Sequence, residues 1–502
     1  MLPEVTQPNQ LAVDTTPMMI EHRGMSLWRM SLVVVVLAAG CTKPNPQSCQ
    51  DGTCTDPAFP FCDLDGALAG EDQTCIAVAC TANEFVACRG DRAITCNATG
   101  TDYELELCSG GCSEAAGGCR LCEPNQTVCA NGKVQTCDAE GVVTASESCV
   151  LGCFDDQPRC RAIKPSNNLA SYLDMVLDPP DLDLANAEFF TDSGVVRQGA
   201  QTVSIPNFLV PGSGNGVPIR VFVVNSLTLN SGSVLINGDA RAYPGEAIAI
   251  VSRHDITITG EVLVAARAGG AALGCLPAGP GAARDAGNGR VLTTGGGGGA
   301  NATDGAAGGS IVSDSPGGIK DVASGTMALV PLRGGCPGGY FEVTSTGTFH
   351  NGGGAIQLSS GTEINIDATI DVRGTLGNFD RFDQTNGFMV GGGGAGGSIL
   401  LEAPRVTLGA NAKLLATGGN GAQACATAST YCGAAGEGTT QTTPATKGMD
   451  VPTAAGANLI ISGGGGGGGL GRLRINTATG TYTKANTAVE AAAATAGMVS
   501  TR

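Results

Sequence analysis

Cysteine is the residue type with the most evident chemistry in this chain of 502 residues. There are 21 cysteines, and setting Cys41 aside leaves 21 − 1 = 20, an even number that is typical of a disulfide framework. The pairs Cys108/Cys112 and Cys119/Cys122 also have a spacing that loosely suits structural zinc. Because no histidine stands near them, we favour disulfides and expect no metal site. The disulfide candidates are Cys49, Cys54, Cys62, Cys75, Cys80, Cys88, Cys96, Cys108, Cys112, Cys119, Cys122, Cys129, Cys137, Cys149, Cys153, Cys160, Cys275, Cys336, Cys425 and Cys432.

Acidic and basic side chains approach a catalytic pattern at two places. One is Arg-His-Asp at residues 253–255, and the other combines Asp367, Asp371 and Arg373. Polysaccharide lyases and hydrolases need clustered carboxylates, or a metal ion with a basic residue. Both groups occur in runs that alternate polar and apolar residues, so an outer strand face explains their charges. We therefore assign no catalytic residue, and an enzyme is the less favoured prediction.

A loop near residue 380 is the chemically densest segment of the chain. Its phenylalanines stand beside acids and an amide, a composition that suits a recognition loop or a cation-binding loop. Alternatively, the phenylalanines only pin the loop to its neighbours, and we favour this simpler interpretation. Asp63 and Asp65 before Gly66 form a weaker calcium candidate, and we expect no other cofactor. The possible binding residues are Phe379, Asp380, Phe382, Asp383, Asn386 and Phe388.

A short apolar run ends at Cys41. It reads Ser-Leu-Val-Val-Val-Val-Leu-Ala-Ala-Gly-Cys over residues 31–41 and follows Arg29. A signal peptide needs an apolar stretch of about 7–15 residues, whereas a membrane span needs about 20. The order resembles the signal peptide of a bacterial lipoprotein, although Ala38 stands where such signals most often have Leu. The resemblance implies an exported chain that is lipidated at Cys41, and Thr42 in the next position implies the outer membrane.

The charge of the chain limits its partners. The formal net charge is −17, and such a surface repels nucleic acid and anionic membranes. We therefore expect no nucleic-acid partner, and the expected contact with a membrane is through the lipid.

The cysteines between the signal and residue 161 form a repeat. From Cys80 to Cys119 the successive steps are 8, 8, 12, 4 and 7 residues, and from Cys122 to Cys160 they are 7, 8, 12, 4 and 7. Modules of about 40 residues bury too little apolar surface to fold without disulfides or metal. The pairing stays open, because six cysteines allow about 15 connectivities. The predicted segments are an over-extended gene start at 1–24, the signal at 25–40, a tether at 41–48, a four-cysteine module at 49–79, and six-cysteine repeats at 80–121 and 122–161.

After a linker at 162–204, a glycine-rich domain at 205–502 shows period-2 apolar pairs. One set of three pairs begins at Ile248, a second begins at Ile356 with the same internal offsets, and a third begins at Ile399 and is one residue shorter after its first pair. Such alternation indicates short strands with one buried face. Strand triplets repeating in this way resemble a right-handed parallel β-helix, and an antiparallel sandwich is the main alternative.

Long stretches rich in glycine and alanine interrupt these sets. They carry too little apolar surface to form a core, so we predict insertions on one edge of the solenoid. We also expect Cys425 and Cys432 to form a local disulfide and Cys275 and Cys336 a longer one.

Together these patterns predict a mainly β protein in which small disulfide-rich modules precede a glycine-rich parallel β-helix. The favoured function is that of a non-catalytic, lipid-anchored surface protein of a Gram-negative bacterium, with a structural or adhesive role towards surface glycans or other cells. The alternatives are a carbohydrate-active β-helix enzyme and a ligand- or protease-binding protein that acts through its cysteine modules.

Overall fold

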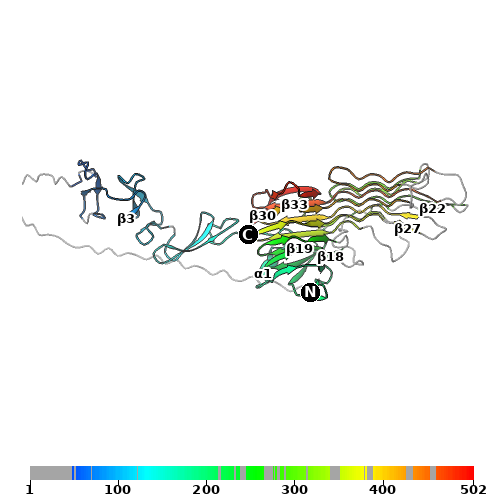
Figure 1. The fold of residues 1–502 in the computed structure, drawn as a ribbon, viewed down its shortest axis with the longest axis horizontal. Helices are drawn as coiled ribbons and strands as arrows, with labels where there is room; N and C mark the ends of the chain where they lie inside the picture. The colour runs from blue at the N-terminus through cyan, green and yellow to red at the C-terminus, as the bar shows by residue number, and fades with distance from the viewer. Residues whose placement is uncertain are drawn as a thin grey trace, which may run out of the picture. The chain divides into compact units, whose positions relative to one another are not determined.

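A computed structural model describes the protein as mainly β, with one short helix among the described residues (Figure 1). The chain separates into two compact units, Met1–Leu107 and Cys108–Arg502. No helix in the described part is long and apolar enough to cross a membrane. The structure describes residues 48–49, 52–68, 71–120, 122–212, 216–230, 233–237, 245–264, 275, 278–279, 283–287, 290–311, 315–339, 351–377, 379–381, 388–424, 434–452 and 460–502.

The described part of the first unit consists of short antiparallel hairpins joined by disulfides. Ile94 is buried, and the rings of Phe61 and Tyr103 pack edge to face with centroids 5.0 Å apart. So small a core depends on its covalent links. Its disulfides are Cys49–Cys62, Cys54–Cys75 and Cys80–Cys96. Its strands are β1 (Phe61–Asp63) paired with β2 (Thr74–Ile76), and β3 (Phe85–Arg89), β4 (Arg92–Cys96) and β5 (Tyr103–Leu107) in that order.

Both six-cysteine repeats share two of their pairings. In each, the first cysteine pairs with the third and the fourth with the sixth. In the second repeat, Cys129 also pairs with Cys153, and the corresponding Cys88 and Cys112 of the first repeat are disulfide-bonded too. The structure thus supplies five of the pairings that cysteine spacing left open in the two repeats. The strands that follow β5 in the repeats are β6 (Cys112–Ser113), β7 (Gly118–Cys119), β8 (Thr127–Ala130), β9 (Lys133–Cys137) and β10 (Val143–Ser148). The disulfides of the repeats that lie within the second unit are Cys108–Cys119, Cys122–Cys137, Cys129–Cys153 and Cys149–Cys160.

Three sheets of mainly parallel strands form the centre of the second unit. Sheet one contains β11 (Asp181–Leu184), β17 (Ser226–Leu229), β20 (Ile256–Ile258), β25 (Glu363–Ile366), β30 (Arg405–Leu408) and β34 (Thr483–Lys484). Sheet two contains β14 (Gln201–Val203), β13 (Val196–Gln198), β12 (Ala187–Phe190), β18 (Ser233–Asn237), β21 (Glu261–Val264), β26 (Thr369–Asp371), β31 (Lys413–Leu415) and β35 (Val489–Ala491). Sheet three contains β15 (Asn207–Val210), β16 (Ile219–Val224), β19 (Ala247–Ser252), β24 (Ala355–Ser360), β29 (Ser398–Glu402), β33 (Arg472–Thr477) and β36 (Ala493–Met498).

The chain passes through these sheets in rotation, and we call one passage a coil. Successive triplets such as β19-β20-β21 and β24-β25-β26 place one strand each in sheets three, one and two. The predicted apolar pairs lie in register, since Ile248 pairs with Ile356 and Ile356 with Ile399. Repeating triplets of parallel strands are therefore confirmed, and the parallel pairing excludes an antiparallel sandwich for these coils.

The register of the third coil differs from the prediction in its last strand. Ile370 pairs with Leu414, whereas the sequence pattern aligned it with Ala412. Ala412 is buried in the turn before β31, so its burial could not distinguish the two alignments. In β31 only Leu414 is fully buried, and a strand of three residues with one core-facing side chain leaves register weakly specified.

The inward side chains of the three sheets form one apolar cluster. It extends from Leu184 to Ala492 and contains every predicted pair of the three sets. In sheet two the inward position of the last strand is polar, because Glu490 of β35 pairs with Leu414 of β31. Glu490 accepts hydrogen bonds from Tyr482 Oη at 2.6 Å and from Lys484 Nζ at 2.7 Å.

The outer face of sheet three is buried as well. The short helix α1 (Ala170–Met175) and Leu332 belong to a second apolar cluster that includes Val221 and Ala249 of the sheet. Beside it, the buried Glu402 accepts hydrogen bonds from Ser166 N at 2.9 Å and Oγ at 2.6 Å. These bonds attach the segment that leads into α1 to the sheet.

All three long glycine-rich segments leave the coils at one corner, as predicted. They follow β21, β26 and β31 of sheet two and return at β24, β29 and β33 of sheet three. Figure 1 shows them as extended traces running side by side from the coils towards β22 (Ala283–Gly287) and β27 (Phe379–Arg381).

The expectation that these segments form no packed interior is wrong. The runs Gly295–Gly299, Gly391–Gly394 and Gly463–Gly469 are buried, and backbone hydrogen bonds replace apolar side chains in their packing. We call this assembly the glycine bundle. Its main segments are residues 295–301, 305–309, 317–324, 333–339, 372–377, 391–397, 418–422, 436–439, 446–449 and 463–471.

Hydrogen-bond partners in the bundle recur every third residue. The amides of Gly463, Gly466 and Gly469 donate to the carbonyls of Thr293, Gly296 and Gly299, at 2.9, 2.9 and 2.8 Å. The amides of the intervening residues of the same run donate to two other segments, with the same three-residue spacing. Three residues per turn without internal hydrogen bonds is the polyproline II geometry, which collagen also uses.

The three glycine runs lie at the centre of the bundle and bond to one another. Gly299 N donates to Gly393 O at 3.0 Å, Gly393 N to Gly466 O at 2.9 Å, and Gly466 N to Gly296 O at 2.9 Å. A Cβ built on Gly298, Gly393 or Gly466 would lie closer than 3.0 Å to a backbone oxygen of a neighbouring segment. Glycine is thus required here for close approach of backbones.

Candidate functional site

A groove with a volume of about 780 Å³ opens where sheet two meets the glycine bundle. Its apolar wall includes the residues Leu263 and Leu376, which are 40% and 67% exposed. Concave sites that combine apolar walls with a few polar groups are typical of ligand binding. The lining residues are Leu263, Val264, Asp371, Arg373, Gly374, Thr375, Leu376, Thr417, Gly418, Gly419, Asn420, Gly438 and Thr440.

Asp371 and Arg373 supply the charges of this groove. Arg373 Nε lies 2.9 Å from Asp371 Oδ2 and Arg373 Nη2 lies 2.6 Å from the same oxygen. The Asp371 side chain is 8% exposed, whereas that of Arg373 is 54% exposed. The hydrogen bond with Asp371 raises the pKa of Arg373 above its usual value, so a positive charge faces the groove.

The other members of the two predicted charged groups lie elsewhere. Asp367 accepts hydrogen bonds from the backbone and side-chain amides of Asn411, which lower the pKa of this carboxyl. Arg253 donates to the carbonyls of Leu173, Val176 and Leu177 at the end of α1. Asp255 accepts a hydrogen bond from Thr362. Neither group therefore assembles a pair of carboxylates around one cavity.

The described ends of the predicted binding loop lie at the end of the glycine bundle away from the coils, where Figure 1 labels β27. Phe379 and Asp380 belong to β27 and Phe388 to β28 (Phe388–Val390), two strands that form an antiparallel hairpin. Strand β28 lies beside β23 (Arg290–Thr293) and β32 (Ile460–Ser462), which pair in parallel and form a sheet with β22. Phe382, Asp383 and Asn386 lie outside the described residues, as do Cys41, Cys425 and Cys432.

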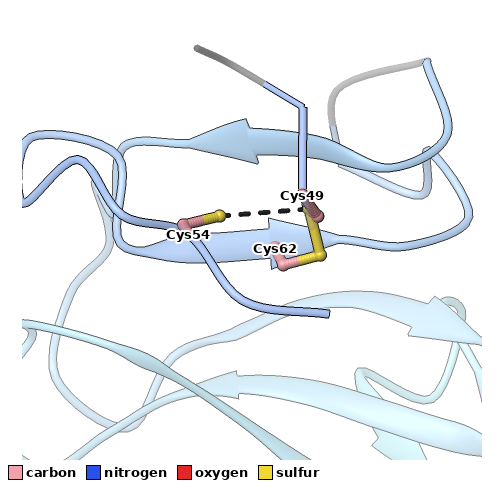
Figure 2. Close-up of side chains that lie close together, drawn as sticks. All are labelled: Cys49, Cys54 and Cys62. Carbon is pink, nitrogen blue, oxygen red and sulfur yellow. Dashed lines mark hydrogen bonds between the residues drawn. A yellow bond between two sulfur atoms is a disulfide. The ribbon is translucent and has the colours of Figure 1, made fainter. Parts of the chain in front are cut away.

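Two disulfides of the first unit lie against each other. Figure 2 shows the Cys49–Cys62 bond beside Cys54, whose Sγ is 3.9 Å from that of Cys49. Cys75, which pairs with Cys54, places its Sγ at the same distance from Cys49. Sulfurs at such separations could surround a metal ion, but only thiolates act as ligands. As paired here, they are a structural clasp.

The remaining metal hypotheses do not converge on a site either. Asp65 forms an ion pair with Arg89 at 2.7 Å, while the Oδ2 atom of the buried Asp63 accepts a hydrogen bond from Leu68 N at 2.8 Å. The two cysteine pairs with zinc-like spacing are disulfide-bonded. Cys275 and Cys336 form a disulfide with each other, the longer pairing expected from the sequence.

Most of the groove was not apparent from the sequence. Leu263 carried a usable signal, since it is an apolar residue at an outward position between the inward Val262 and Val264. Thr375 and Asn420 carried none, because only the folding of the bundle brings these segments together. Comparison with protein families, with characterised proteins and with solved structures gives no match.

Proposed function

We propose that the protein is a non-catalytic, lipid-anchored cell-surface protein with a structural or adhesive role. In this proposal Cys41 carries the lipid, the cysteine modules form a spacer, and the three sheets close into a right-handed parallel β-helix that carries the glycine bundle. The observation that best supports it is the bundle itself. Backbone hydrogen bonds join the segments of the bundle. Two adjacent antiparallel strand pairs, β22–β23 and β27–β28, lie at the end of the bundle.

The groove supports binding more than catalysis. Glycoside hydrolysis ordinarily needs two carboxylates about 5–10 Å apart. The described lining of the groove holds one, Asp371, and Arg373 already occupies it. An exposed guanidinium in a groove with an apolar wall instead suits a carboxylated polysaccharide, whose acid groups would accept hydrogen bonds from Arg373.

The two alternatives predict different results. A carbohydrate-active enzyme would use the Asp371 groove for turnover. A ligand- or protease-binding protein would instead use the disulfide-linked hairpins of the cysteine modules.

The first experiment measures binding of polygalacturonate to the purified full chain, with neutral dextran as a reference. Replacing Arg373 by Ala should weaken binding about tenfold, as expected for loss of one charge-assisted hydrogen bond. Arg405→Ala is the matched control, because Arg405 is similarly exposed and pairs with Glu363 at 3.0 Å outside the groove. Equal effects of both variants would contradict the groove, and polymer cleavage that Asp371→Asn abolishes would favour the enzyme. In cells, Cys41→Ser should release the protein from the membrane, and continued retention would contradict the anchor.

A further inference from the structure

The last strand of sheet three, β36, has an unprotected edge. Its residues, Ala493–Met498, contain no charge and no proline. The other strands of the last coil are protected, because β34 is only two residues long and includes Lys484, and the buried Glu490 occupies the inward position of β35. Natural edge strands are ordinarily short or charged, which prevents pairing with another chain. Strand β36 is the exception among the last strands of the three sheets.

One side of the β36 backbone is unpaired in the described structure. The amides of Ala493 and Val499 donate towards β33. Because these groups alternate in direction along a strand, the N–H and C=O groups of Ala494, Ala496 and Met498 face the opposite side. No described strand pairs with that side of β36. Such a row of backbone donors and acceptors is a template for a further β-strand.

The inward face of β36 is open as well. Ala494 and Ala496 stand in register with Leu473 and Ile475 of β33, which belong to the apolar cluster of the coils. Both alanines are exposed, and Met498 in the same row is 69% exposed. At the other end of the coils, the antiparallel strands β13, β14 and β15 extend sheets two and three. Solenoids need terminal caps to stay soluble, and β36 lacks one in the described part of the chain.

The chain beyond β36 already pairs with an antiparallel segment. Ile163 forms an antiparallel bridge with Thr501. Beside it, Lys164 N donates to Ser500 O at 2.7 Å. Since backbone groups alternate in direction, the Ser500 carbonyl lies on the same side as that of Met498. The segment before α1 thus occupies this edge after β36 and leaves β36 itself free.

We propose that two copies of the chain pair antiparallel through β36 about a two-fold axis perpendicular to the sheet, so that sheet three continues from one copy into the other. Opposite residues of an antiparallel pair lie on the same face. With the axis at Ala496, Met498 of each copy lies opposite Ala494 of the other. In the same register Thr495 lies opposite Gly497, so larger side chains meet smaller ones throughout. About six backbone hydrogen bonds form, and the pairing uses neither the groove nor the lipid.

The test is sedimentation equilibrium of the purified full chain as the Cys41→Ser variant, so that no lipid contributes to association. We expect a monomer–dimer equilibrium with a micromolar Kd, as for other small interfaces. The formal net charge of −17 makes two copies repel each other, so added salt should strengthen the dimer. Ala496→Lys should weaken it more than about tenfold, because it places two lysines opposite each other on the axis. Its circular dichroism and Tm should match those of the parent chain, because Ala496 is exposed.

Leu209→Lys is the matched control. Leu209 is 47% exposed on β15, at the opposite edge of sheet three, so this variant should dimerise like the parent chain. If it disrupts association as Ala496→Lys does, the copies join head to tail, which contradicts the two-fold pairing. Met498→Glu is a second variant with the same expected loss if Ala496→Lys does not fold. A parent chain that stays monomeric up to ~100 µM in high salt, or a dimer that survives these β36 variants, would overturn the proposal.

Discussion

Gly298, Gly393 and Gly466 lie in the three central runs of the bundle, where neighbouring backbones contact each other directly. Backbone oxygens of adjacent segments lie against each of these glycines. The Cβ atom of an alanine at any of the three positions would be closer than 3.0 Å to one of these oxygens. The usual entropic benefit of replacing glycine by alanine is about 0.4–1 kcal/mol, whereas overpacking costs about 1–3 kcal/mol or more. Steric conflict should therefore dominate at these residues.

Gly393→Ala should lower the free energy of unfolding by about 2–3 kcal/mol and speed hydrogen exchange at the amides of Gly466 and Gly299. Urea unfolding and exchange mass spectrometry measure both effects. Val322→Ala is the control, because Val322 is 50% exposed on an outer segment of the same bundle and should change stability little. If both variants behave alike, backbone packing is not what orders the bundle.

The stacking of the coil strands was predictable from the sequence, whereas the glycine bundle was not. Ile248, Ile356 and Ile399 were identifiable as stacked because period-2 alternation marks a strand with one buried face. The glycine bundle was not predictable in this way. Its three-residue period lies in the hydrogen-bond partners, and a run such as Gly463–Gly469 shows no periodicity in its residue types. The groove depends on the bundle, so the charges of Asp371 and Arg373 were noted in the sequence but were assigned to an outer strand face.

The last coil ends the apolar interior with a polar group. Replacing Glu490 by Ala would leave Tyr482 Oη and Lys484 Nζ without their common acceptor at the end of the core. Hydrogen bonds to charged groups contribute about 1.5–3 kcal/mol, so we expect a loss of about 2 kcal/mol in urea unfolding. Tyr482→Phe should cost about half as much, because it removes one neutral donor. Glu437→Ala, at an exposed glutamate, is the control, and an equally large loss there would refute a specific role for Glu490.

The whole molecule combines two ways of holding a chain together. The first unit has a small core joined by closely spaced disulfides, whereas the second has the continuous apolar cluster of the coils and the hydrogen-bonded bundle. A disulfide typically stabilises a small domain by about 2–4 kcal/mol, which is comparable to the whole stability of a module of this size. The cysteine modules should therefore respond to reduction differently from the coils and the bundle.

Dithiothreitol in native buffer should expose residues 49–107 to protease while residues 162–502 stay resistant and keep most of the β-sheet circular dichroism. Peptide mapping locates the cuts. Because we predict that Cys425 pairs with Cys432, thiol titration before reduction should find no free cysteine in the lipidated chain. The matched variant is Cys275→Ala/Cys336→Ala, which removes the disulfide anchored at the buried Cys336 in the bundle. Because backbone hydrogen bonds surround Cys336, this variant should keep the resistant fragment. Cleavage throughout residues 162–502 on reduction would mean that the bundle and coils depend on disulfides as the small modules do.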